Sequence, residues 1–234
     1  MDAVDVGRPA GTVVVVDPDV VVWEVATGRR RAALRTGGLT ATALAFTPDG
    51  TRLVAGAYET RIEEDVSRQR AALWIWRTSD LSEISRHEIG QYQVVDLAIS
   101  PDGTLIAVTG ASRRVELYDL DGSTVDADFA GHATTTRGVV FSPDGAAVAV
   151  TSSGDQIVRL WDVRSGGLTA QLAGHVSDVN ALAFSPDGGY LYTASHDSSA
   201  GLWQLDPEVA VERLCGIVGP AGRADDAPRP AACR

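Results

Sequence analysis

The chain has 234 residues, of which 44% are hydrophobic, and carries a formal net charge of −11, with arginine and no lysine among its basic residues. An acidic chain with one short basic run disfavours nucleic-acid and anionic-membrane partners, because phosphate binding needs clustered positive charge. No apolar run approaches the roughly 18 residues that a membrane span needs, and two cysteines do not make a disulfide scaffold. We therefore expect a cytoplasmic protein with one domain, residues 1–205, followed by a tail.

The first predicted unit, residues 11–36, is incomplete. Asp17 precedes Trp23 by six positions, but no opening strand and no proline-containing turn come before it. The run Arg29–Arg31 is the densest basic stretch of the chain. We interpret it as a solvated loop between strands and not as a phosphate site.

The second unit, residues 37–80, introduces a four-residue turn that recurs along the chain. Thr47–Gly50 suits a type I turn, with a hydroxyl residue first, proline second and glycine fourth. The same phrase returns at Ser100–Gly103, Ser142–Gly145 and Ser185–Gly188, so the prolines recur at intervals of 53, 42 and 43 residues. A period of about 40–45 residues is typical of propeller blades.

The first of these intervals is longer than the others, and the excess lies between the predicted strands Leu53–Ala57 and Ala71–Trp76. On a propeller we expect this inserted segment, Glu59–Arg70, to project as a loop from one face, where insertions are often functional. One interpretation is a long charged hairpin without a partner. The other is a charged lip that docks another protein, formed by Arg61, Glu63, Glu64, Asp65, Arg68 and Arg70.

The remaining units cover residues 81–124, 125–167 and 168–205. An aromatic residue keeps the same period as the turns, at Trp23, Trp76, Tyr118, Trp161 and Trp203. In the last two units the spacing matches further. A Gly-His pair precedes the turn proline, and an aspartate precedes the tryptophan by six positions in both.

These features resemble the WD-repeat family of β-propellers, over roughly residues 13–205. The resemblance rests on the four turns and on Gly131-His132, Gly174-His175, Asp155, Asp197, Trp161-Asp162 and Trp203. It implies an all-β fold of four-stranded antiparallel blades, of which this chain supplies about four full ones and one partial one.

The resemblance also implies one buried hydrogen-bonded network per blade. Because the group recurs between blades, we interpret it as structural and not as a catalytic triad. Carried over by position, the two sets are His132, Thr151, Asp155, Trp161 and His175, Thr193, Asp197, Trp203.

The family most often uses seven blades, so these units leave the ring incomplete. Three outcomes stay open: a fragment or degraded copy of a longer propeller, association with a second chain through the open edges, or a small ring or open arc. The last unit has three predicted strands and ends at Leu205. Val13–Val16 is a candidate for its missing fourth strand.

Residues 206–234 differ in character from the repeats. Asp206 and Pro207 suit the start of a short helix, and a tail rich in Gly, Pro, Ala and Arg is expected to be disordered after it. The segment WQLDPEVAVERLC resembles the end of propellers in large actinobacterial signalling proteins that carry an NTPase or kinase region, which favours a C-terminal fragment. The states of Cys215 and Cys233 stay open.

No catalytic, cofactor or metal site is predicted. The chain has no phosphate loop, no nucleophile elbow and no histidine pair at metal-ligand spacing. We expect a non-catalytic scaffold that binds other proteins in a signalling or regulatory assembly. The alternatives are a truncated fragment without a function of its own, and a propeller enzyme with an active site in the central channel, for which three inner strands offer only Asp96 and Asn180.

Overall fold

The computed structural model describes residues 4–7, 12–17, 19–63, 66–90, 93–132 and 134–206. The regular structure of these residues consists of 19 β-strands in five antiparallel sheets, without a helix. Four sheets have four strands and the last has three. The predicted all-β fold of four-stranded antiparallel sheets is therefore confirmed. The predicted helix and tail, with both cysteines, lie outside the described residues.

The five sheets follow one another along the chain. Sheet 1 contains β1 (Val4–Gly7), β2 (Thr12–Asp17), β3 (Asp19–Glu24) and β4 (Arg29–Leu34). Sheet 2 contains β5 (Thr40–Phe46), β6 (Arg52–Glu63), β7 (Val66–Arg77) and β8 (Glu83–Ile89). Sheet 3 contains β9 (Val94–Ile99), β10 (Leu105–Gly110), β11 (Val115–Asp119) and β12 (Thr124–Phe129). Sheet 4 contains β13 (Thr136–Phe141), β14 (Ala147–Ser152), β15 (Asp155–Asp162) and β16 (Leu168–Ala173). Sheet 5 contains β17 (Val179–Phe184), β18 (Tyr190–Ser195) and β19 (Ala200–Gln204).

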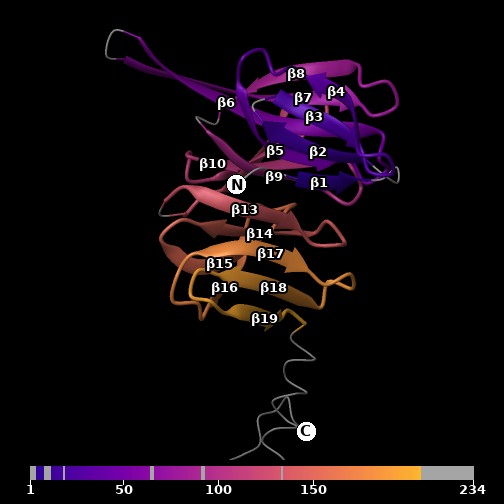
Figure 1. Ribbon diagram of the computed structural model, residues 1–234. Coiled ribbons are helices and arrows are strands. Elements are labelled where there is room, and N and C mark those ends of the chain that lie inside the picture. The colour runs from indigo at the N-terminus through magenta and orange to yellow at the C-terminus, as the bar shows by residue number, and fades with distance from the viewer. Residues whose placement is uncertain are drawn as a thin grey trace, which may run out of the picture.

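The first strands of the sheets form an inner row. In this row β1 contacts β5, β5 contacts β9, β9 contacts β13 and β13 contacts β17. The sheets fan out from the row as blades, with sheets 1 and 2 at one end of the described structure and sheet 5 at the other (Figure 1). The described strands thus form an arc of five blades and do not close a ring.

Sheet 1 corrects two expectations about the start of the chain. It has an opening strand, β1, and β2 pairs with β1 on one side and with β3 on the other. Val13–Val16 therefore lies inside sheet 1 and is not the fourth strand of sheet 5. β2 pairs with β3 and not with sheet 5 because β2 and β3 are neighbours in sequence, and sequential strands usually pair. Arg29–Arg31 is likewise not a loop, because it begins the outer strand β4.

The four repeated turns share one set of hydrogen bonds. In each, the glycine N–H donates to the carbonyl of the first residue at 2.7–2.9 Å, and the glycine φ is between 68° and 73°. The aspartate accepts the hydroxyl of the first residue at 2.5 Å and the N–H two residues further on at 3.0 Å. These bonds stabilise the ionised carboxylates, so the pKa of all four aspartates lies below the usual range, and that of Asp49 falls to about 2.

Apolar packing between successive sheets follows one rule. The aromatic residue on the third strand of a sheet packs toward the sheet before it, and the residue preceding that aromatic packs toward the sheet after it. Alternation of side chains along a strand places these two neighbours on opposite faces. Next to a neighbouring sheet these positions are buried at Val22, Ile75, Leu117 and Leu160 on one side and at Trp76, Tyr118 and Trp161 on the other, and Trp203 is partly buried.

Candidate functional site

The inserted segment is not a loop. The strands β6 and β7 continue through it as a paired hairpin, with backbone register from Glu59–Arg70 to Glu63–Val66. We call residues 59–70 the β6–β7 arm, which extends outward beyond the sheets (Figure 1). Paired strands hold such an arm out from the body, because their backbone hydrogen bonds are satisfied between them.

The six predicted docking residues fall on three parts of this arm. Arg61, Glu63 and Arg68 lie on the paired strands, where Arg61 and Arg68 are register partners. Glu64 and Asp65 lie between β6 and β7, outside the described residues. Arg70 lies at the root of the arm.

The root of the arm is tied to β8 by charged side chains. Arg70 Nη2 donates to Glu88 Oε1 at 2.6 Å, and Arg86 Nη2 lies 3.6 Å from the same oxygen. The hydrogen bond from Arg70, with its charge, holds the pKa of Glu88 below its usual range. Arg86 in turn stacks 4.8 Å from the ring centre of the buried Trp74. These contacts link the root of the arm to the outer strand β8.

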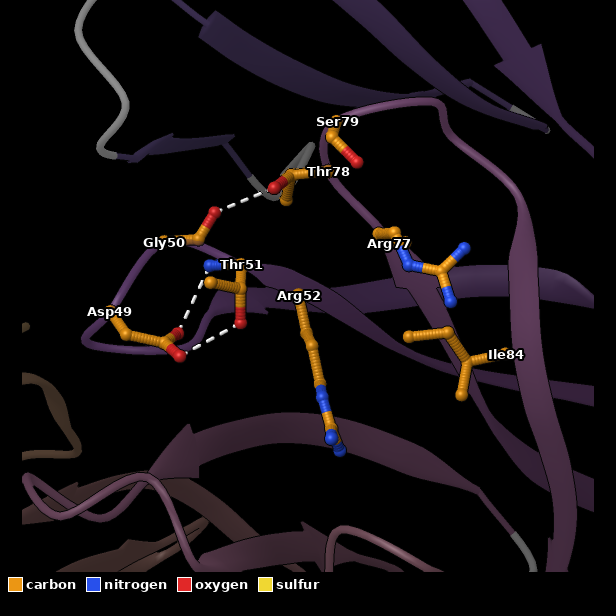
Figure 2. A pocket seen from close by; sticks show the side chains of 8 residues that line it. All are labelled: Asp49, Gly50, Thr51, Arg52, Arg77, Thr78, Ser79 and Ile84. Carbon is orange, nitrogen blue, oxygen red and sulfur yellow. Dashed lines mark hydrogen bonds between the residues drawn. The ribbon is translucent and has the colours of Figure 1, made fainter.

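A pocket of about 650 Å³ opens where sheet 2 carries its repeated turn (Figure 2). Arg52 and Arg77 are register partners on β6 and β7, and both line it. The other lining residues are Asp49, Gly50, Thr51, Thr78, Ser79 and Ile84.

Arg52 and Arg77 differ in how they are held. The Arg77 guanidinium donates to Asp80 at 3.3 Å and to the Ser82 hydroxyl at 2.9 Å. The Arg52 guanidinium has no hydrogen-bond partner among the described residues. It also lines a second pocket of about 330 Å³, which reaches to the next turn at Pro101–Gly103. The lining of the two pockets carries both signs of charge, from Asp49 and Asp102 as well as from Arg52 and Arg77.

Sequence reasoning missed this pair of pockets. Arg52 follows its turn at the position where the other three turns are followed by Leu105, Ala147 and Tyr190. That single departure from the repeat is the signal that was available. The pairing of Arg52 with Arg77 has no such signal in the sequence, because it depends on strand register.

The structure joins all four residues of the second predicted network. Trp203 Nε1 donates to Thr193 Oγ1 at 3.0 Å, and Thr193 Oγ1 lies 2.7 Å from His175 Nε2. His175 Nδ1 lies 2.9 Å from Asp197 Oδ2. A neutral imidazole with its proton on Nδ1 gives every donor in this chain an acceptor. The hydroxyl of Ser199 and the N–H of Val176 also bind Asp197, and together they lower its pKa.

The first predicted set is not joined in this way. His132 Nδ1 contacts Ser152 Oγ at 2.6 Å, and Thr151 Oγ1 accepts the N–H of Gly138 at 2.9 Å. Asp155 forms an ion pair with Arg159. Among the described side chains, the buried His132 Nε2 and Trp161 Nε1 have no hydrogen-bond partner.

Strand register explains the difference between the two sets. Leu191 pairs with Trp203, and Val148 pairs with Trp161. Two residues further along, Thr193 of sheet 5 therefore corresponds to Val150 of sheet 4. Thr151 lies one position beyond, and a shift of one residue turns a side chain to the other face of the sheet.

The two inner-strand candidates for a channel site bind neighbouring strands. The carboxylate of Asp96 on β9 accepts the N–H of Leu97 at 2.9 Å and the N–H of Val139 on β13 at 3.2 Å. Burial raises the pKa of Asp96 to about 6. Asn180 on β17 accepts Arg137 Nη1 of β13 at 3.5 Å. Both side chains thus join adjacent sheets.

The described residues lack two kinds of feature. No helix there is long and apolar enough to cross a membrane. No cluster of three or more histidine, cysteine, aspartate or glutamate side chains with the arrangement of a metal site occurs in the same part of the chain.

Comparison with protein families gives a match to the WD domain, G-beta repeat, over residues 79–119, 123–162 and 166–204. Each matched segment begins at or before the outer strand of one sheet and ends in the third strand of the next. The sequence repeat is thus offset by one strand from the structural sheet.

Three curated relatives are similar to parts of the chain. An uncharacterized WD repeat-containing protein of Synechocystis is 32% identical over 50% of this chain and 30% of its own length. The WD repeat-containing protein SL1-17 of Schistosoma mansoni is 31% identical over 60% of this chain and 43% of its own length. Human apoptotic protease-activating factor 1 is 42% identical over 26% of this chain and 5% of its own length. The chain spans less than half the length of these relatives.

Proposed function

The chain belongs to the WD-repeat family, and we propose that it is a non-catalytic scaffold that holds partner proteins in a signalling or regulatory assembly. WD domains generally mediate protein–protein interactions, and they are generally not catalytic. The name of one relative, apoptotic protease-activating factor 1, describes a regulatory protein. That likeness supports the regulatory part of the proposal.

The observation that carries the proposal is the β6–β7 arm. In the other described four-stranded sheets the two central strands have 5–8 residues, whereas β6 and β7 have 12 each. The six charged docking residues comprise three arginines and three acids, and with Glu59 the arm carries both signs of charge and a net charge of −1. Such a surface selects partners by the pattern of charge.

Removing the arm while keeping its root tests this proposal. Thr60 and Gln69 are register partners, so replacing residues 61–68 with Asn-Gly leaves a two-residue hairpin turn between them. Affinity capture from an extract of the native cells, read by mass spectrometry, should recover specific proteins with the original chain and lose them with the shortened arm.

A matched variant keeps the arm and removes its charges. Serine, threonine or glutamine replaces Arg61, Glu63, Glu64, Asp65 and Arg68, which changes the net charge by a single unit. We expect this variant to lose the same proteins as the shortened arm. Recovery of an unchanged set of proteins with both variants would refute docking on the arm.

A further inference from the structure

The two end sheets break the packing rule that the interior sheets follow. At the position before the aromatic residue, the four earlier sheets bury their side chain, but Leu202 of sheet 5 is 58% exposed. At the aromatic position, Trp23 of sheet 1 is 38% exposed, whereas Trp76, Tyr118 and Trp161 are buried. Each end therefore exposes the kind of face that the interior covers.

The exposed face of sheet 5 is apolar across its three strands. Tyr192 is 47% exposed and is the register partner of Leu202. Ala183 on β17 is the register partner of Tyr192 on the other side, and it is also exposed. The corresponding residues of sheet 4, Ala149 and Leu160, are buried beneath sheet 5.

The two ends also differ in charge: arginines gather on and just after the outer strand β4 of sheet 1, whose other strands hold four acids, whereas sheet 5 and its turns hold aspartates alone. Sheet 1 and the residues just after it hold the exposed arginines Arg29, Arg30, Arg31 and Arg35, and Arg30 is the register partner of Trp23. Sheet 5 and its turns hold Asp178, Asp187, Asp197 and Asp206, and no arginine or lysine occurs from residue 165 to 206.

We infer that sheet 1 of one copy of this chain packs on sheet 5 of a second copy. The interface continues the one that already joins each sheet to the next, with the Trp23 face of one copy covering the Tyr192–Leu202 face of the other. The arginines of β4 then meet a sheet that has no basic residues and exposes Asp187 at its turn, which supplies attraction between the ends. Because the two faces differ, the contact is head-to-tail and propagates until the assembly closes.

Light scattering coupled to size-exclusion chromatography tests this inference on the full chain. The original chain should have a mass above that of one copy, rising with concentration and falling when salt screens the charges. Leu202→Asp and Trp23→Asp should each be monomeric alone at concentrations at which the original chain associates. Ile84→Asp is the matched control, since Ile84 is 40% exposed in sheet 2, away from both end faces, and it should assemble as the original chain does.

Mixing Leu202→Asp with Trp23→Asp tests the head-to-tail contact directly. Each variant retains one intact face, so an equimolar mixture should form a complex of two chains that grows no further. A monomeric original chain at the highest concentration would overturn the inference. So would assembly by Trp23→Asp alone, because that result indicates a symmetric contact between two sheets 5. If circular dichroism shows that Leu202→Asp is unfolded, Tyr192→Lys replaces it in the mixture.

Discussion

Sheets 4 and 5 carry the same spacing of histidine, aspartate and tryptophan, yet they differ in their hydrogen bonds. In sheet 5 a continuous chain of bonds runs from Trp203 through Thr193 and His175 to Asp197. In sheet 4 the tryptophan N–H and one histidine nitrogen have no partner among the described residues. The position that holds Thr193 in sheet 5 holds Val150 in sheet 4, and valine offers no hydroxyl.

The hydrogen-bonded network of each sheet therefore follows strand register and not distance along the sequence. Thr151 and Thr193 each precede their tryptophan by ten residues, which suggested that they were equivalent. Counted from the repeated turn, Thr151 lies one residue further along than Thr193. That one residue decides which face of the sheet its hydroxyl occupies.

Gly201→Ala should disturb sheet 5 most. A methyl group at Gly201 would lie 2.4 Å from Thr193 Oγ1 and 2.7 Å from Trp203 Nε1, so the network must move apart. We expect a loss of about 2–3 kcal/mol in the free energy of unfolding, as for overpacked cores. Urea unfolding followed by tryptophan fluorescence measures it.

Gly90→Ala is the control for this change. A methyl group at Gly90 would lie 3.5 Å from Glu116 Oε2, an ordinary contact, and should have little effect. Equal stability losses in the two variants would show that crowding of the network is not the cause.

Thr193→Val should break the continuous chain of hydrogen bonds in sheet 5, so that it resembles the incomplete set in sheet 4. The substitution removes the hydroxyl between Trp203 Nε1 and His175 Nε2 and leaves both buried groups without that partner. Leaving buried polar groups unsatisfied costs about 1–3 kcal/mol. Thermal and urea unfolding should both show the loss. An unchanged stability would mean that the bonds contribute nothing net.

The parts of the molecule that were predictable depend on local chemistry. The repeated turns follow from proline, glycine and aspartate at fixed positions, and their period predicts the sheets. The extension of β6 and β7 was not predictable, because its charged residues show no apolar alternation and the pairing is made by the backbone. The pocket around Arg52 and Arg77 and the identity of Thr193 as the counterpart of Val150 depend on register, which one sequence does not reveal.

His132→Gln should remove a pH dependence of stability that arises from the buried histidine of sheet 4. Burial, with a smaller contribution from the charge of Arg159 and opposed by Asp155, lowers the pKa of His132 to about 4. The unfolded chain, with a histidine pKa near 6.5, binds the proton more readily between these values. The contribution of neutral His132 to the free energy of unfolding is therefore fully present above pH 6.5. It is lost as the pH falls toward 4, by up to about 1.4 kcal/mol per pH unit.

The variant should remove this part of the slope when unfolding free energies are compared between pH 4 and 6.5. His196→Gln, at an exposed histidine of a turn, is the control and should keep the slope. A slope that is the same in the original chain and in His132→Gln would assign the acid sensitivity to other groups.

Val150→Thr is the smallest change and the most direct test of the register argument. A hydroxyl at this position would face the unpaired Trp161 Nε1 and His132 Nε2, as Thr193 does in sheet 5. Placing a hydroxyl in an ordinary apolar core costs stability, as we expect for Val54→Thr, whose residue is equally buried. Because the new hydroxyl can form hydrogen bonds with these two nitrogens, Val150→Thr should be more stable than Val54→Thr by about 1 kcal/mol, the net value of one hydrogen bond. Equal losses in the two variants would mean that a missing hydroxyl is not what separates sheet 4 from sheet 5.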